Sequence, residues 1–182
     1  MSKLLVVIDY QNDFVVGSLG FEGAKNLDNK IYDAVRWYYL RGEYIIFTKD
    51  THDDNYFKTR ESKIVPILHC KKGTAGNDVY GITGIEYDKI KDSDNVFTIE
   101  KKSFAIDPED IVSLRSKLTE VRDIVICGLV TNICVISNVI MFQSAFPEAK
   151  IIVESKVCDS NDKYEHYKAL DIMKKLGVEV IE

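Results

Sequence analysis

The sequence lacks any long apolar run and any cluster of basic residues. None of its 182 residues falls in a stretch that approaches the roughly 20 consecutive apolar residues needed to span a bilayer. The formal net charge is −5, and apart from Lys-Lys pairs there is no basic run that could follow a phosphate backbone. No export signal precedes the first charged residues. We therefore expect a soluble, cytoplasmic protein that binds neither nucleic acid nor membrane.

Cysteine, histidine and tryptophan are also scarce, with four, three and one residues respectively. The cysteines form no Cys-x-x-Cys pair, and in a mid-sized chain without an export signal we expect reduced thiols rather than disulfides. The glycine-rich segment 17–23 lacks the G-x-G-x-x-G spacing, so it gives no support to a dinucleotide site. The single tryptophan, Trp37, falls in a segment of helical periodicity.

Short runs rich in Val and Ile alternate along the chain with segments of helical periodicity. The runs cover residues 4–8, 44–47, 96–99, 123–127, 150–154 and 178–181. Uninterrupted apolar runs of this length are typical of parallel strands covered on both faces. The pattern predicts one α/β domain over residues 1–182, with a doubly wound, mostly parallel sheet of about six strands and helices on both faces. Residues 49–94 are expected to form the one long irregular segment, and a loop of this length usually has a function.

Ionisable residues follow four of the six predicted strands. In chain order they are Asp9, then Asp50 and His52, then Lys101 and Lys102, and finally Cys134. The carboxyl ends of parallel strands meet at one edge of the sheet, where ligands bind in folds of this kind. We therefore expect an acid, a lysine, a thiol and a metal-binding pair to converge on one rim.

Two cysteines lie close together in "VICGLVTNICVIS", residues 125–137, and only one of them is a candidate reagent. Cys127 lies inside a predicted strand and should be an inert, buried thiol. If Thr131 caps the following helix, Cys134 lies in the first turn, where free backbone N–H groups favour a thiolate. The alternative for Cys134 is a small core residue.

Asp50 and His52 have the spacing of a metal-binding pair. In an extended segment they lie on the same face of the chain, and His69 could add a third ligand. The alternative is a capped turn with a packed loop histidine. His166 lies on a polar helical segment, and we expect it to be solvated.

Taken together, these motifs resemble the isochorismatase-like cysteine hydrolases, and among them the nicotinamidases. The resemblance rests on four separated motifs in the family's order. They are "VVIDYQNDFVVGSL", "TKDTHDDN" with "ESKIVPILHCKKGTAG", "IEKKSF" and "CGLVTNICV", followed by the closing "ALDIMKKLGVEVI".

The resemblance implies a catalytic triad of Asp9, Lys101 and Cys134. It also implies a cis peptide between Leu129 and Val130, which would aim the N–H groups of Val130 and Cys134 at one oxyanion. The implied metal ligands are Asp50, His52 and His69, with Glu61 or water completing the site. The expected cofactor is one divalent ion, with zinc first and manganese or iron as alternatives.

The implied activity is hydrolysis of nicotinamide to nicotinate and ammonia through a thioester, within NAD salvage. Because the family's usual pocket tryptophan is absent, aromatic contacts to the substrate would come from Phe14, Tyr56 or Phe104. Partners are expected to be a small amide and further copies of the chain in a homo-oligomer. Alternatives are another small amide, an isochorismate-like substrate, a silent binding module, or a thiol redox sensor in which Cys134 reacts with oxidants.

Overall fold

Strands and helices alternate along the whole chain, in a computed structural model that describes residues 2–118 and 120–182. The elements are β1 (Ser2–Ile8), α1 (Asn12–Val15), α2 (Asp28–Tyr39), β2 (Tyr44–Asp50), α3 (Gly81–Ile90), β3 (Val96–Lys101), α4 (Pro108–Lys117), β4 (Val121–Leu129), α5 (Ile136–Ala145), β5 (Lys150–Asp159), α6 (Lys163–Lys175) and β6 (Glu179–Ile181). Each predicted apolar run coincides with a strand.

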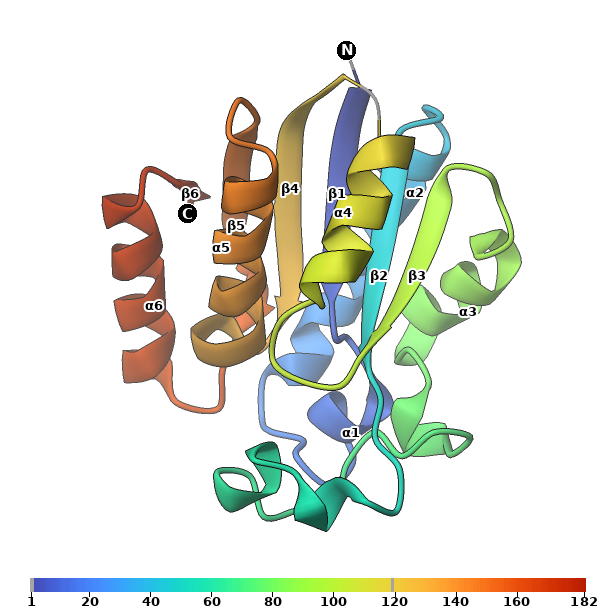
Figure 1. The fold of residues 1–182 in the computed structure, drawn as a ribbon, viewed down its shortest axis with the longest axis vertical. Coiled ribbons are helices and arrows are strands. Elements are labelled where there is room, and N and C mark those ends of the chain that lie inside the picture. Colours follow the sequence, from blue (N-terminus) through green and yellow to red (C-terminus); the bar gives the residue numbers. More distant parts are fainter. Residues whose placement is uncertain (1, 119) are drawn as a thin grey trace.

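The six strands form one parallel sheet in the order β3-β2-β1-β4-β5-β6. Helices α2 and α3 pack on one face, and α4, α5 and α6 pack on the other (Figure 1). This confirms the predicted doubly wound α/β fold. The strand order reverses between β1 and β4, and in such sheets the carboxyl ends of the strands at that point form the ligand-binding crevice.

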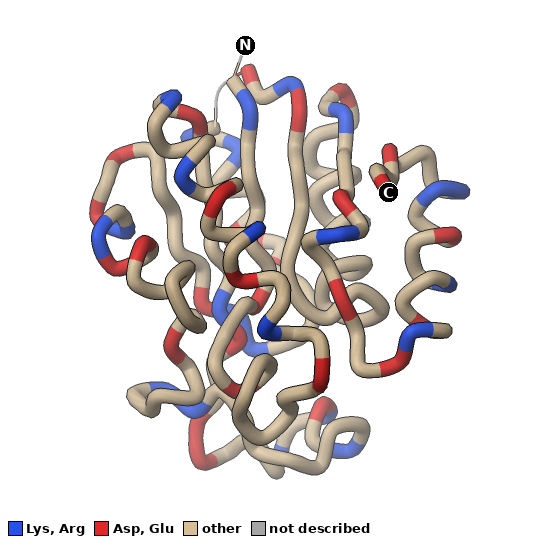
Figure 2. The backbone as a smooth tube through the Cα atoms, turned by 180° about the vertical axis from the view of Figure 1, so that it is seen from behind, with Lys and Arg blue, Asp and Glu red and all other residues tan. Residues whose placement is uncertain are grey.

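The core is built from strands that are apolar on both faces. In β1, all five residues from Leu4 to Ile8 are at most 1% exposed, so side chains pointing to opposite faces are equally buried. Helices on both sides of the sheet account for this pattern. Along the backbone, Lys, Arg, Asp and Glu lie more on the outer helices and loops than on the central strands (Figure 2).

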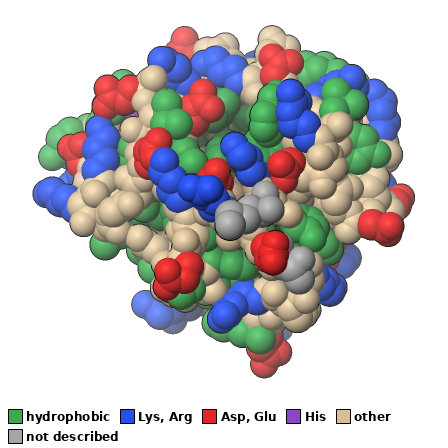
Figure 3. Space-filling model, turned by 90° about the horizontal axis from the view of Figure 1, so that it is seen from above, with side chains coloured by type: hydrophobic (Ala, Val, Ile, Leu, Met, Phe, Trp, Pro, Cys, Tyr) green, Lys and Arg blue, Asp and Glu red, His purple; other side chains and the backbone are tan. Residues whose placement is uncertain are grey.

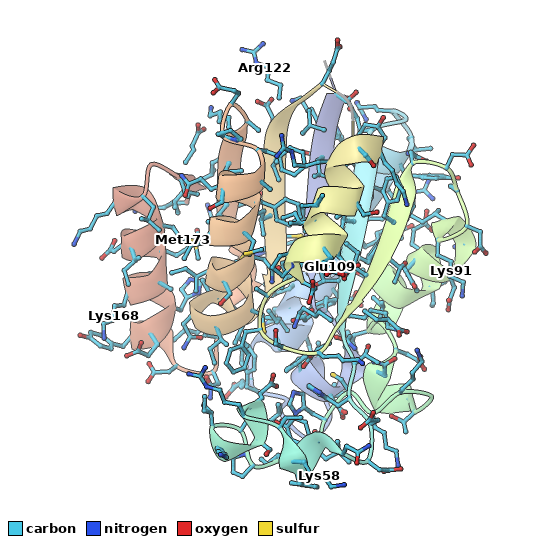
Figure 4. All side chains as sticks on the ribbon, in the orientation of Figure 1. Lys58, Lys91, Glu109, Arg122, Lys168 and Met173 are labelled. Carbon is cyan, nitrogen blue, oxygen red and sulfur yellow. The ribbon has the colours of Figure 1, made fainter. Side chains whose placement is uncertain are left out.

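Local capping explains where α4 begins. Pro108 opens α4, and the Asp107 carboxylate accepts a hydrogen bond from the Glu109 N–H at 2.9 Å. Helix α6 is amphipathic: Met173 is buried against the body of the molecule, while Lys168 points outward (Figure 4).

The prediction that residues 49–94 are irregular is wrong for residues 81–90, which form α3. The cap of this helix comes from a distant segment. The Asp28 carboxylate accepts hydrogen bonds from the N–H groups of Ile82 and Thr83, at 2.9 and 3.0 Å. A start signal located more than fifty positions away cannot be found by local pattern reading.

The surface seen from the amino ends of the strands mixes basic and acidic side chains, with no broad area of one sign (Figure 3). Within the described residues, no helix combines the length and the apolar character that a membrane crossing requires.

Candidate active site and metal centre

The predicted rim residues meet at the carboxyl ends of the four strands around the switch point. Asp9 follows β1, Asp50 and Lys101 are the last residues of β2 and β3, and Cys134 lies in the turn after β4. All four are buried, with Cys134 the most exposed at 5%. The sheet therefore brings an acid, a lysine and a thiol together from remote segments of the chain.

Asp9 is held by its own backbone and by the neighbouring strand. Its φ of 46° lies in the left-handed region, which Asp tolerates better than most residues. The Thr48 hydroxyl donates to Asp9 Oδ1 at 2.7 Å, and the Asp9 N–H donates back to Thr48 Oγ1 at 3.1 Å. One carboxylate oxygen is thus fixed, and the other faces the lysine.

Lys101 lies between the other members of the cluster. Its Nζ is 2.7 Å from Asp9 Oδ2, 3.4 Å from Asp50 Oδ1 and 3.9 Å from Cys134 Sγ. It also donates to the Ser103 carbonyl at 2.8 Å. Lys102, the other lysine of the pair, is exposed and does not join this group.

The protonation states follow from burial and from the charge on Lys101. Burial raises the pKa of the Cys134 thiol well above its ordinary value, although Lys101 opposes the shift. Burial also raises the pKa of Asp9, again against the effect of Lys101. For Lys101 burial disfavours the charge, but Asp9, Cys134 and Asp50 outweigh it and raise its pKa. Burial therefore opposes the thiolate that a position at a helix start favours, so a base near Cys134 would ease its ionisation.

The turn that carries Cys134 has a special backbone. The Leu129–Val130 peptide is cis, and residues Thr131–Val135 form one π-helical turn that leads into α5. Just before it, Gly128 has a φ of 116°, and a Cβ there would lie 2.0 Å from the Ile8 carbonyl oxygen. Only glycine allows β4 to run this close to β1 at the switch point.

The predicted cap at Thr131 is not observed. The residue before the turn in the capping position is Val130, and no side chain caps the turn. The Thr131 hydroxyl instead contacts His166 at 2.8 Å. The expectation that His166 is solvated is also wrong, because its side chain is 5% exposed. Cys127 is fully buried in β4, as predicted.

The predicted metal ligands converge on a single point. The Nε2 atoms of His52 and His69 both lie 3.0 Å from Asp50 Oδ2, and they lie 3.4 and 3.6 Å from Glu61 Oε1. All four residues offer ligand atoms within 4.8 Å of one another. Ligands bound at about 2.0–2.2 Å around one ion are spaced at roughly 3.0–3.6 Å from one another. The spacing of this group fits a divalent cation.

The tautomer of His69 and the charges around His52 also fit a metal site. The His69 Nδ1–H donates to the Ile67 carbonyl at 2.8 Å, which leaves Nε2 free as a ligand. Burial disfavours protonation of His52, but the hydrogen bonds with Asp50 and Glu61 prevail and raise its pKa to about 9. Asp50 Oδ1 faces the Lys101 ammonium group, whereas Oδ2 faces the Nε2 atoms of both histidines. A buried carboxylate oxygen beside two inward-facing imidazole nitrogens is a group that a metal ion would satisfy.

A cavity of about 180 Å³ opens above the thiol and the metal group. Phe14 and Phe104 line it, as predicted, together with Val130, Cys134, Asp50 and His69. Tyr56 does not line it. Its ring packs behind the metal group, 4.5 Å from the His52 ring, and its hydroxyl donates to the Val65 carbonyl at 2.6 Å.

Sequence reasoning missed the rest of the cavity wall. It is formed by Leu19, Phe21, Val65, Ile133 and Asn161. Leu19 and Phe21 lie within the glycine-rich segment 17–23, whose glycine spacing argues against a dinucleotide site but indicates nothing about these two side chains. Asn161 follows the end of β5, so the strand-end rule that identified Asp9 could have been extended to it.

Buried amides that fix the rim were missed as well. Gln11 accepts from the Asp50 N–H at 2.7 Å and donates to the Asp50 carbonyl at 2.9 Å. Asn138 donates to the carbonyls of Cys134 and Phe104, at 2.8 and 3.1 Å, and so ties the turn that carries Cys134 to the cavity wall. Asn and Gln carry no sequence signal for such a role, because the partners are backbone groups of distant segments.

Fold and site together define an α/β enzyme whose cavity lies at the switch point of a parallel sheet. Residues 3–182 match the family model of the isochorismatase domain. The chain therefore belongs to the isochorismatase family, and it is a hydrolase. Membership of a hydrolase family argues against the two alternatives of a thiol redox sensor and a silent binding module.

Similar proteins extend over the full chain. The Bacillus subtilis (strain 168) isochorismatase family protein PncA is 27% identical, and the alignment covers all of both chains. A crystal structure of nicotinamidase PncA from Bacillus subtilis superposes with a TM-score of 0.87 at 28% identity, again over all of both chains. A Streptococcus mutans pyrazinamidase/nicotinamidase structure has a TM-score of 0.85 at 30% identity and covers 99% of this chain and 100% of its own.

Proposed function

We propose that this hydrolase is a metal-containing cysteine amidase that converts nicotinamide and water to nicotinate and ammonia. The observation that carries the proposal is the ion pair of Lys101 with Asp9 at 2.7 Å, with the Cys134 sulfur 3.9 Å from the same ammonium group. The similarity to nicotinamidase structures over the whole chain supports the choice of substrate.

The first half of the reaction forms a thioester. Asp9 takes the thiol proton, and the Cys134 sulfur attacks the amide carbon while the carbonyl electron pair moves onto oxygen. Backbone N–H groups of the turn at Val130 and Cys134 stabilise this oxyanion. The intermediate then collapses, the C–N bond breaks, and the nitrogen takes the proton from Asp9 and leaves as ammonia. Lys101 keeps Asp9 oriented throughout.

The second half hydrolyses the thioester. Water gives a proton to Asp9 and attacks the same carbonyl carbon, which again places charge on the oxygen facing the turn. Collapse breaks the C–S bond, Asp9 returns its proton to the sulfur, and the carboxylic acid loses its proton to solvent and leaves as nicotinate. A base with a raised pKa suits this cycle, because Asp9 must both accept and return a proton.

The metal group adjoins the cavity, and we propose that Asp50, His52, His69 and Glu61 hold one divalent ion, with zinc as first choice and manganese or iron as alternatives. When bound, such an ion would coordinate the ring nitrogen or water and fix the position of the substrate. Glu61, only 9% exposed, is one of these ligands in our proposal.

The cavity favours a small, flat substrate. Its volume of about 180 Å³ is below the roughly 300 Å³ at which pockets begin to take drug-sized ligands. Its walls are mainly apolar, with Phe14 and Phe104 able to pack against a ring. A single-ring amide fits this description better than a branched, highly charged substrate such as isochorismate.

Ammonia release from nicotinamide, pyrazinamide, benzamide and short aliphatic amides tests the proposal. Nicotinamide should be among the best substrates, and Cys134→Ala should abolish turnover of every amide. Robust activity on an aliphatic amide with none on nicotinamide would change the substrate and keep the mechanism. Turnover that survives Cys134→Ala would overturn the mechanism. Cytoplasmic location, NAD salvage and a homo-oligomer remain predictions.

A further inference from the structure

His166 makes a buried contact with the turn that carries the nucleophile. Its Nδ1 lies 2.8 Å from the hydroxyl of Thr131, which is fully buried. Thr131 is the first residue after the cis peptide and the first of the π-helical turn that ends just past Cys134. This hydrogen bond thus joins α6 to the turn whose N–H groups stabilise the oxyanion in the proposed reaction.

A second contact holds the next residue of the same turn. The Ser160 hydroxyl donates to Asn132 Oδ1 at 2.8 Å, and the Asn132 N–H points at Ser160 Oγ at 3.4 Å. Thr131, Ser160 and His166 are all buried, and Asn132 is half-buried. The turn is therefore anchored at two successive positions, by His166 of α6 and by Ser160 of the β5–α6 connection.

The surroundings of His166 favour a neutral ring. Burial lowers its pKa, Lys163 acts in the same direction, and Asp159 opposes them. Lys163 and Asp159 pair with each other at 2.5 Å, which weakens the influence of both. A neutral imidazole has one donor and one acceptor nitrogen, so it can exchange one hydrogen bond with a hydroxyl without placing a charge beside the turn.

We propose that His166 and Thr131 are positioning residues that align the backbone N–H groups of the turn with the oxyanion. This rests on the proposed amide hydrolysis. Neither side chain touches the substrate cavity, so their effect on chemistry passes through the backbone between Val130 and Cys134. Since the oxyanion forms only in the transition state, a misaligned turn lowers kcat and leaves KM nearly unchanged.

Matched substitutions separate this role from mere packing. Thr131→Val keeps the shape and removes the hydroxyl, whereas Thr131→Ser keeps the hydroxyl. His166→Asn retains a polar atom near the position of Nδ1, whereas His166→Gln places it near Nε2. His166 also lines a larger cavity of about 1040 Å³ on its other side, so these changes should be tolerated.

Thr131→Val and His166→Gln should each lower kcat about 10- to 100-fold, less than the roughly 100- to 1000-fold loss of a whole oxyanion donor. KM should stay within about two-fold, and Thr131→Ser and His166→Asn should keep most of the activity. The double variant Thr131→Val/His166→Gln should be no slower than the worse single variant. Unchanged kcat in folded Thr131→Val, or fully multiplicative losses in the double variant, would overturn the proposal.

A second readout does not depend on amide turnover. Pyridine-3-carbaldehyde labelled with ¹³C at the aldehyde adds the Cys134 S–H across its C=O bond to give a thiohemiacetal, whose oxygen occupies the oxyanion position. NMR titration should show affinity falling in Thr131→Val in step with kcat. If the wild type binds the aldehyde but releases no ammonia from amides, the proposed function is wrong. The proposed role of His166 and Thr131 would still hold in that case if Thr131→Val weakens aldehyde binding. Equal aldehyde affinity in wild type and Thr131→Val would overturn the proposed positioning role of His166 and Thr131 without affecting the proposed function.

Discussion

The interior of the sheet and its carboxyl-end rim are equally buried, yet they are built on opposite principles. In β1, Leu4 to Ile8 are apolar and fully enclosed, and the next residue, Asp9, is enclosed to the same degree. The interior gains stability from removing apolar surface from water. The rim instead holds a carboxylate and an ammonium that must compensate each other for lost hydration.

The difference shows where the protein gives up stability for chemistry. Burial raises the pKa of Asp9, whereas Lys101 and the hydrogen bond from Thr48 favour its charged form. A well-packed apolar group of the same size at this position would give a more stable folded state. Variants that separate stability from activity can therefore test the contrast between interior and rim.

The two cysteines of the β4–α5 segment give the largest expected contrast. Cys134→Ala should lower kcat/KM at least about 1000-fold, because it removes the nucleophile. Cys127→Ala, two residues before the end of β4, should change kcat less than about three-fold and should only cost stability, since it leaves a small cavity. Ammonia release and thermal unfolding measure both. Comparable activity losses in the two variants would contradict the proposed functional difference between the rim and the interior.

The buried pair of Lys101 and Asp9 should affect activity and stability differently. Lys101→Met leaves a buried carboxylate unpaired, which costs about 3–5 kcal/mol in comparable cases, and it should also abolish most activity. Adding Asp9→Asn to Lys101→Met removes the stranded charge. The double variant should regain stability in urea unfolding while remaining inactive. Recovery of activity together with stability would show that the pair is structural only.

Removing the metal should have an intermediate effect. Chelation should lower turnover of nicotinamide, and adding zinc back should raise both activity and Tm, because an ion that binds only the folded state stabilises it. His69→Ala is the matched control and should lose the zinc-dependent rise in Tm. Elemental analysis of protein purified without a histidine tag identifies the metal. A Tm that changes neither on chelation nor on addition of zinc would contradict the proposed metal centre.

The strand pattern and the rim residues could be predicted because both depend on local sequence. Apolar runs identify buried parallel strands, and in such a sheet an ionisable residue directly after a run, such as Asp9 or Lys101, must lie at the binding edge. The family resemblance then identified Glu61, which no spacing rule would select. The structure brings Glu61 to within 3.4 Å of His52 Nε2.

Other features could not be read from the sequence because their partners lie far away in the chain. Helix α3 depends on a cap from Asp28, and the environment of His166 depends on Thr131. His166 lies on a helix with polar neighbours, so its pattern indicates exposure, and only the packing of α6 against the nucleophile turn buries it. For Cys134 the sequence shows only the helix start, which favours a thiolate, whereas burial of the side chain by distant segments opposes it.

Two positions on β2 offer a matched test at smaller scale. Ile46→Val removes one methylene group from the interior and should cost about 0.5–1.5 kcal/mol with no change in kcat. Thr48→Val replaces the hydroxyl that donates to Asp9 and keeps the shape, so it should cost a similar amount but lower kcat several-fold. Urea unfolding and steady-state kinetics on both variants measure the contrast. Equal effects on kcat would show that Thr48 does not orient the base.

The smallest expected effect is a pH dependence from His166. Burial and Lys163 lower the pKa of His166 in the folded protein, with Asp159 opposing, whereas in the unfolded chain the pKa should be near the ordinary histidine value of 6.5. The unfolded state therefore binds the proton first, so the stabilisation is complete above about pH 6.5 and is lost as the pH falls towards the folded pKa. Thermal unfolding between pH 7.5 and 5 should show a steeper decline for wild type than for His166→Asn. All other ionisable groups are common to both proteins, so their contributions cancel in the difference. A steeper decline in His166→Asn would mean that Asp159, rather than burial, controls the charge on this ring.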